Sequence, residues 1–135
     1  VETVVPRLRA TLDAAALCKM AERGQITGGV LDGPLAFDNA VSMVAAKAKG
    51  LLSAVAGRAD VLIVPDIEAG SMLVKQLEHL GDAVSAGVVL GAAVPIVVPS
   101  RAASVESRVA SCALAALIAN SLPRQPGLRP STRVA

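Results

Sequence analysis

The sequence predicts an α/β sandwich of one domain's length. Apolar runs with the composition of strands alternate with segments that have the spacing of helices, a pattern typical of layered α/β proteins. The run VLIV at 61–64 lies between Asp60 and Pro65 without a polar residue, as expected of a strand that is covered on both faces. The chain has 135 residues, 53% of them hydrophobic and 18% charged, so it can bury a core.

Four segments have the composition of helices, and a small polar residue or a glycine marks their ends. We expect helices over residues 11–23, 38–49, 71–80 and 104–119. Thr11 and Asp38 are placed to cap the first two, and Gly24, Gly50 and Gly81 to end the first three. In the last helix, six residues at helical spacing form the predicted buried face: Val105, Val109, Cys112, Ala113, Ala116 and Leu117.

Four short apolar runs are predicted strands, and each is followed by a loop. The runs are 26–31, 61–64, 88–90 and 95–98, and the loops are 32–39, 65–71, 91–94 and 99–104. In α/β sheets, ligands bind beyond the carboxyl ends of the strands. We therefore look for the functional site in these loops.

The loop at 99–104 contains a candidate anion site. Ser100 and Arg101 stand just before the last predicted helix, and free N–H groups and the helix dipole favour negative charge there. The alternative is that Ser100 or Ser104 only caps the helix. Asp38 as a helix cap and Asp66 as a turn residue are equally ordinary alternatives to a functional role.

Charge and aromatic content argue against a nucleic-acid partner. The formal net charge is +2, and three arginines of residues 121–135 leave 10 basic and 11 acidic residues in 1–120. Phe37 is the single aromatic residue, so base stacking has no platform. The uncharged stretch 83–100 contains two glycines and two prolines, a composition that favours two short strands over a membrane-spanning helix.

The cysteines and the histidine are expected to be structural. Cys18 and Cys112 lie far apart with no metal-ligand spacing, which predicts free buried thiols in a reducing compartment, hence the cytoplasm. His79 has no Cys, His or paired acid at ligand spacing and is expected at the surface. No signal peptide is visible, and the initial Val1 suggests a fragment or processed product. No metal site is expected.

Three stretches carry a resemblance to the phosphate acetyl/butyryltransferase family. They are ITGGVLDGPLAFDN at 26–39, AGRADVLIVPDIEAGSMLVKQL at 56–77 and GVVLGAAVPIVVPSRAASVESRVASCALAA at 87–116. The resemblance covers roughly residues 10–120. It implies an acyltransferase that converts acyl-CoA and phosphate into acyl phosphate and CoA, with coenzyme A as a substrate and no permanently bound cofactor or metal. Some relatives are fused to an enoyl-CoA hydratase-like module.

The resemblance also implies an architecture. Family members have two three-layer α/β/α domains, an arrangement related to that of isocitrate and isopropylmalate dehydrogenases, with the active site between them, and are usually homodimers. This chain would supply the second domain over 25–103. Residues 1–24 would lead in from a missing first domain, 104–120 would be a helix returning to it, and 121–135 a disordered tail.

Individual residues match the family's site. Ser100 and Arg101 match a Ser-Arg pair beside the reacting thioester and phosphate, where Arg101 would hold phosphate and Ser100 would steady the oxyanion. On the substrate and CoA side, the matching residues are Asp32, Gly33, Asp38, Asp66, Gly70 and Ser71.

Some positions depart from the family pattern. Ser107 stands where some members have an aspartate that deprotonates the CoA thiol, so this task would fall to Glu106, another carboxylate, or the field of Arg101 on a free thiol. Ala103 and Ala93 replace residues that are often polar. The alternative function is therefore a non-catalytic CoA-binding or assembly module that keeps the fold. A nicotinamide-dependent dehydrogenase has less support, because no aspartate cluster for a metal is visible.

Overall fold

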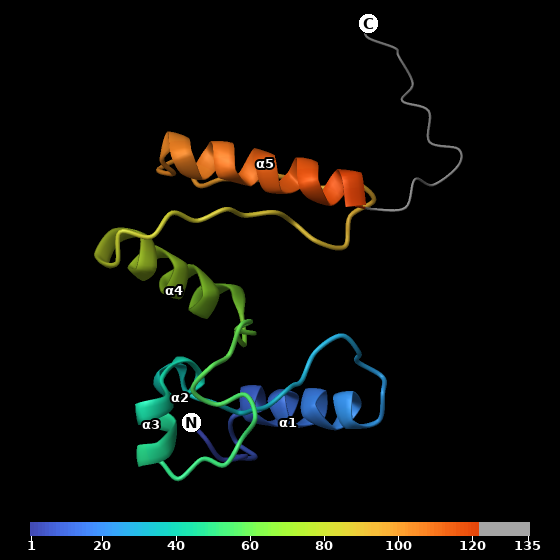
Figure 1. Cartoon of the computed structure of the whole chain (residues 1–135), viewed down its shortest axis with the longest axis vertical. Coiled ribbons are helices and arrows are strands. Elements are labelled where there is room, and N and C mark those ends of the chain that lie inside the picture. Colours follow the sequence, from blue (N-terminus) through green and yellow to red (C-terminus); the bar gives the residue numbers. More distant parts are fainter. Residues whose placement is uncertain (122–135) are drawn as a thin grey trace, which may run out of the picture. The chain divides into compact units, whose positions relative to one another are not determined.

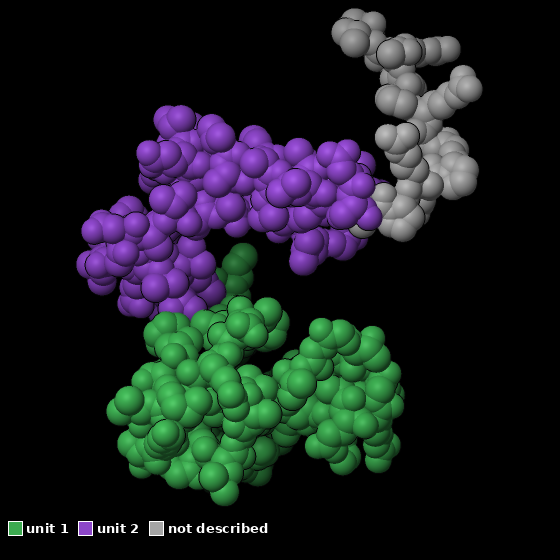
Figure 2. All heavy atoms as spheres, in the orientation of Figure 1, with its two compact units in different colours: residues 1–69 green, residues 70–135 purple. Residues whose placement is uncertain are grey.

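The computed structural model describes residues 1–121, which contain five helices and divide into two compact units (Figures 1 and 2). The first unit is Val1–Ala69 and the second begins at Gly70. The predicted tail at 121–135 lies outside the described residues except for Ser121. The domain boundaries expected from the resemblance stay predictions.

The first helix, α1 (Arg9–Glu22), confirms the predicted helix but begins two residues earlier. The expected Thr11 cap is wrong, because Thr11 lies inside the helix and is almost fully buried. Its hydroxyl accepts the Val5 N–H at 2.9 Å and lies within hydrogen-bond distance of the carbonyl oxygens of Val5 and Leu8, which share its single proton and tie the N-terminal segment to the helix. Gly24, with φ of +72°, follows the helix end as predicted.

The predicted helix at 38–49 is two short helices, α2 (Phe37–Val41) and α3 (Met43–Ala48), which pack against each other. Ser42 separates them in an extended conformation, and its hydroxyl caps α3 by accepting a hydrogen bond from the Ala45 N–H. Asp38 lies in the first turn of α2, so its expected role as the cap is wrong.

Asn39 is fully buried and joins three parts of the first unit. Its side-chain Nδ2 donates to Glu2 Oε1 at 2.7 Å, and its backbone carbonyl accepts the Gly57 N–H at 2.7 Å. The N-terminal segment, α2 and the loop before residue 60 therefore meet at one side chain.

The helix α4 (Ile67–Leu80) starts four residues before the predicted position, inside the expected loop. Asp66 immediately precedes it, and its carboxylate accepts the Ala69 N–H at 2.7 Å. Asp66 is thus a helix cap. No residue of α4 is buried.

The last helix, α5 (Val105–Ser121), confirms the predicted element, but its predicted buried face is wrong. The six apolar residues expected to be covered are all exposed. Ser107 and Ser111 are buried instead. The segment after α4 runs along α5 (Figure 1), and the Gly87 N–H donates to the Ser111 hydroxyl at 3.0 Å.

None of the four predicted strands forms within the described residues, which contain only one isolated antiparallel bridge, between Val89 and Ile96. The Val89 N–H donates to the Ile96 carbonyl at 2.8 Å. The run 61–64 is exposed along its length. Strands are stable only beside partners and over a covered face, and neither is present here. The α/β sandwich is therefore not confirmed.

Apolar burial is small for so hydrophobic a chain. Among residues 1–121, the buried apolar side chains are the alanines Ala40, Ala46 and Ala56, all in the first unit. Large apolar residues such as Leu52 and Ile67 are almost fully exposed. In the same part of the chain, no helix is long and apolar enough to cross a membrane.

Candidate functional site

A hollow of about 160 Å³ in the second unit brings together three of the predicted site residues. Ser71 reaches it from α4, Ser100 from the loop before α5, and Ser107 from the first turns of α5. Lys75, Glu78, Ser85, Ser111 and small apolar residues complete the lining. These residues are far apart in the sequence but all belong to the second unit, so the hollow exists only when this unit is folded.

Three hydroxyls at the hollow are already hydrogen-bonded within the protein. Ser111 donates to the Ser107 carbonyl at 2.7 Å, and the Ser107 hydroxyl accepts from Ser104 Oγ at 3.2 Å. Ser85 donates to the Glu78 carboxylate. Ser107 is also buried, so its hydroxyl serves the packing of α5.

The remaining polar groups of the hollow have free hydrogen-bond donors. Ser71 makes no side-chain hydrogen bond to the described residues, and Ser100 only accepts one, from the Ala102 N–H at 3.3 Å. Lys75 is exposed and, within residues 1–121, has no acidic partner within 4.0 Å. Lys75 belongs to none of the predicted site residues, and the one signal for it in the sequence is its position one helical turn after Ser71.

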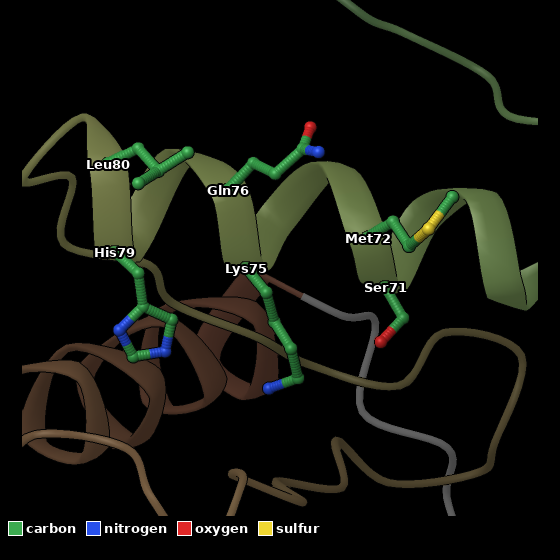
Figure 3. Close-up of a pocket in the computed structure, with 6 residues that line it drawn as sticks. All are labelled: Ser71, Met72, Lys75, Gln76, His79 and Leu80. Carbon is green, nitrogen blue, oxygen red and sulfur yellow. The ribbon is translucent and has the colours of Figure 1, made fainter.

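A second, shallower hollow of about 310 Å³ lies along α4 and shares Ser71 and Lys75 with the first (Figure 3). Ser71, Lys75 and His79 point to one side of the helix, whereas Gln76 and Leu80 point to the other (Figure 3). His79 is exposed, as predicted. Ser71 and Lys75 on this side of α4 also line the smaller hollow, whereas His79 does not.

Arg101 and Gly70 belong to the second unit but do not line the smaller hollow. Arg101 is exposed, and its carbonyl accepts a hydrogen bond from Arg108 Nη2 at 3.0 Å. Its own guanidinium makes no bond to the described residues, which leaves it available to an anion. Gly70 lies within α4 rather than in the expected loop.

The loop containing Asp32 and Gly33 is held against α1. Asp32 accepts the Gly33 N–H at 2.8 Å, and the Cys18 thiol donates to the Gly33 carbonyl at 3.7 Å. Partial burial, and then the negative charges of Asp32 and Glu22, raise the pKa of the Cys18 thiol. Cys18 is a free thiol as predicted, but it is only half-buried, and Cys112 is exposed, so the expected burial of the two thiols is wrong.

Asp38 takes part in an ion-pair cluster with Lys49 and Glu2. Lys49 Nζ lies 2.6 Å from Glu2 Oε1 and 2.9 Å from Asp38 Oδ2. Its hydrogen bonds lower the pKa of both carboxyl groups, and the two carboxylates raise the pKa of Lys49. The Asn39 Oδ1 beside this cluster is buried without a partner in the described part of the chain. Nothing in the spacing of the sequence pointed to this cluster.

The described residues contain no group of three or more His, Cys, Asp or Glu side chains placed to hold a metal ion. Asp32, Asp38 and Asp66 are each engaged by a neighbouring N–H or lysine. The predicted site residues thus fall into two sets, with the three aspartates and Gly33 in the first unit and the serines, Gly70 and Arg101 in the second.

A solved structure identifies the class of protein to which this backbone belongs. The chain matches a branched-chain phosphotransacylase from Enterococcus faecalis V583 with a TM-score of 0.74 and 32% identity, over 86% of this chain and 41% of that one. The backbone of this chain is thus similar to that of about two fifths of this phosphotransacylase.

Sequence comparisons narrow the class. A family profile described as "Phosphate acetyl/butaryl transferase" matches residues 3–116. A phosphate acetyltransferase of Rhizobium meliloti is 65% identical over 119 residues, 88% of this chain and 38% of that protein. A phosphate butyryltransferase of Clostridium acetobutylicum is 47% identical over 121 residues, 90% of this chain and 40% of that protein. The chain belongs to the phosphate acetyl/butyryltransferase family, and it spans about two fifths of the length of these relatives.

Proposed function

We propose that the polypeptide containing this chain transfers an acyl group between coenzyme A and inorganic phosphate. Membership of the family supports this activity, and relatives named for acetyl and for butyryl transfer support a short acyl chain. The observation that carries the proposal is the hollow where Ser71, Ser100 and Ser107 meet, with Arg101 next to Ser100 in the chain. The substrates are CoA, acyl phosphate and phosphate, and no further cofactor is needed.

The reaction is a direct transfer. An oxygen of phosphate attacks the thioester carbonyl carbon, the C–S bond breaks, and the proton of the phosphate passes to the CoA sulfur. The Arg101 guanidinium holds the phosphate by charge-assisted hydrogen bonds. The Ser100 hydroxyl, whose proton is free, donates to the oxyanion of the tetrahedral intermediate. No covalent acyl-enzyme is required, because holding the two reactants in line supplies the rate advantage.

The Ser107 hydroxyl does not deprotonate the CoA thiol in the reverse direction. It is buried and bonded to Ser104, and a serine hydroxyl is no base at neutral pH. Deprotonation therefore falls to Glu106, which lies in the first turn of α5, or follows from the positive charge of Arg101, which favours the thiolate.

We place this chain in a larger, two-domain enzyme. The share of the relatives that it spans supports this arrangement, and so do the exposed apolar residues Val105, Val109 and Leu117 along one side of α5. In the whole enzyme, the run 61–64 and the other apolar runs would join a sheet between helical layers. A cytoplasmic homodimer is the assembly we propose, and these 135 residues alone would be nearly inactive.

A non-catalytic module that binds CoA or assembles with other chains is the second candidate. Ala103, which the resemblance places where family members often have a polar residue, lines the hollow, and Ser107 offers no base. Such a module would bind its partners and show no acyl transfer.

The test follows thioester formation by ultraviolet absorbance in the complete natural polypeptide, with acetyl, propionyl and butyryl phosphate and CoA. Arg101→Ala should lower kcat/KM by about 30- to 1,000-fold, because a lost charge-assisted contact in the transition state costs about 2–4 kcal/mol. Arg23→Ala, which removes an exposed arginine at the end of α1, is the control and should leave the rate unchanged. Absence of turnover with every acyl phosphate would favour the second candidate.

A further inference from the structure

The smaller hollow has an excess of free hydrogen-bond donors. Lys75, Ser71 and Ser100 all line it, and none of their side chains donates a hydrogen bond to another described residue. Lys75 is the single basic residue of this lining. A lysine that is free of an acidic partner beside two free hydroxyls is suited to a ligand with several acceptor oxygens and negative charge.

The acceptors of the hollow are largely engaged. Glu78 is the single acidic residue of the lining, and its carboxylate already takes the Ser85 hydroxyl. Glu78 follows Lys75 by three residues on α4, yet their charged atoms are not within 4.0 Å. Lys75 therefore forms no ion pair with Glu78.

The size of the hollow limits what can enter. Its volume is about 160 Å³, whereas pockets that enclose drug-sized ligands measure about 300–1,000 Å³. A tetrahedral phosphoryl group is small, carries negative charge and offers several acceptor oxygens, so it matches both the volume and the donors.

We propose that Lys75 contacts a phosphoryl group of the substrates in this hollow, with the hydroxyls of Ser71 and Ser100 as its companion donors. This inference rests on the proposed function for the identity of the ligand. The phosphoryl group has two possible sources, which are phosphate or acyl phosphate on one side and the phosphates of CoA on the other. Lys75 acts in addition to Arg101, which does not line the hollow.

The test compares Lys75→Gln with wild type in the complete polypeptide, by steady-state kinetics with each substrate varied in turn. We expect kcat/KM for one substrate to fall about 10- to 100-fold, the effect of losing one hydrogen bond to a charged group. Lys75→Arg, which keeps the positive charge, should retain most of the wild-type kcat/KM. A rise in KM confined to acyl phosphate and phosphate identifies the small substrate as the source, and a rise confined to CoA identifies the coenzyme.

The adjacent Gln76 provides a matched control. The double variant Lys75→Gln/Gln76→Lys keeps the composition and net charge of α4 but moves the ammonium by about 100° around the helix, to the side where Gln76 points (Figure 3). It should be as impaired as Lys75→Gln. Recovery of the wild-type rate in the double variant would show a general charge effect and overturn the proposal.

A binding measurement separates this proposal from the proposed function. If the small substrate is the source, broadening of the ³¹P resonance of inorganic phosphate by the complete polypeptide should be at least tenfold weaker for Lys75→Gln; if the coenzyme is the source, the ³¹P resonances of CoA should show this loss instead. If the wild type binds phosphate or CoA through Lys75 but turns over no acyl phosphate, the contact stands and the proposed function fails. If the wild type is active and Lys75→Gln keeps its kinetics and its binding of phosphate and CoA, the Lys75 contact is refuted while the function stands. If neither turnover nor the binding of phosphate or CoA responds to Lys75, the contact is likewise refuted.

Discussion

Gly57 is the position where the structure makes its sharpest prediction about stability. Its φ is +85°, and a Cβ added there would lie 2.6 Å from Met43 Cα and 2.8 Å from Met43 N. These are backbone atoms at the start of α3, so no side chain can rotate away. The Gly57 N–H also donates to the Asn39 carbonyl at 2.7 Å, which prevents the loop from shifting without losing a buried contact.

The change in the free energy of unfolding for Gly57→Ala combines two destabilising effects and one stabilising effect. A left-handed conformation costs an ordinary L-residue about 1–2 kcal/mol, and forcing extra volume into a packed site costs about 1–3 kcal/mol. The smaller conformational entropy of unfolded alanine returns about 0.4–1 kcal/mol. We expect a net loss of about 1–4.5 kcal/mol, which is a large part of the roughly 5–15 kcal/mol that stabilises a typical domain.

The assay is urea unfolding of the complete polypeptide, with hydrogen exchange of residues 37–59 as the local readout. Gly50→Ala is the matched control, because Gly50 has a φ of +67° but open space around its Cα. It should lose only the conformational part, about 1 kcal/mol. Equal losses for the two variants would refute the argument from close contact with Met43.

Two further predictions concern the hydrogen bonds that hold each unit. Lys49 lowers the pKa values of Glu2 and Asp38 in the folded protein, so the stability that these carboxylates contribute is present above the ordinary carboxyl pKa and is lost as pH falls through the lowered values. Lys49→Met should therefore make the free energy of unfolding depend less on pH in the acid range, and thermal unfolding between about pH 2 and 6 measures this change. Ser111→Ala should destabilise the second unit by about 0.5–1.5 kcal/mol, because the exposed Gly87 N–H loses the Ser111 hydroxyl as its hydrogen-bond acceptor. Hydrogen exchange of the Gly87 amide measures this effect.

Each of these two has a control in the same unit. Lys47→Met removes an exposed lysine with no acidic partner among the described residues and should leave the acid profile unchanged. Ser121→Ala removes an exposed hydroxyl at the end of α5 and should have little effect. An acid profile of Lys49→Met that matches the wild type, or a Ser111→Ala variant as stable as Ser121→Ala, would contradict the corresponding argument.

Local signals located the helices well. Gly24 and Gly50 follow helix ends as predicted, and Asp66 and Ser104 act as caps because a short polar side chain can satisfy the first free N–H groups. The split between α2 and α3 was missed, because Ser42 fits a helix interior as well as a cap and only the contact with Ala45 decides between them.

Strands and faces could not be predicted in the same way. Whether the run 61–64 forms a strand depends on partners elsewhere in the chain or beyond it, and the described residues provide none. The periodicity of α5 identified its apolar side. It could not show which side of the helix is covered in this unit, and the buried residues are Ser107 and Ser111. For the site, the resemblance identified Ser71, Ser100 and Ser107, whereas Lys75 became visible only through the hollow.

The three buried alanines have a thermodynamic consequence. The heat-capacity change of unfolding comes mainly from apolar surface that becomes hydrated, and these two units hide little of it. Their own unfolding should therefore carry a heat-capacity change well below the usual value of about 12–15 cal/mol/K per residue. Most of the apolar side chains of this sequence would leave water only when another surface covers them. The large heat-capacity change that accompanies apolar burial is therefore expected when the chain associates with that surface, where it is negative, rather than when each unit folds.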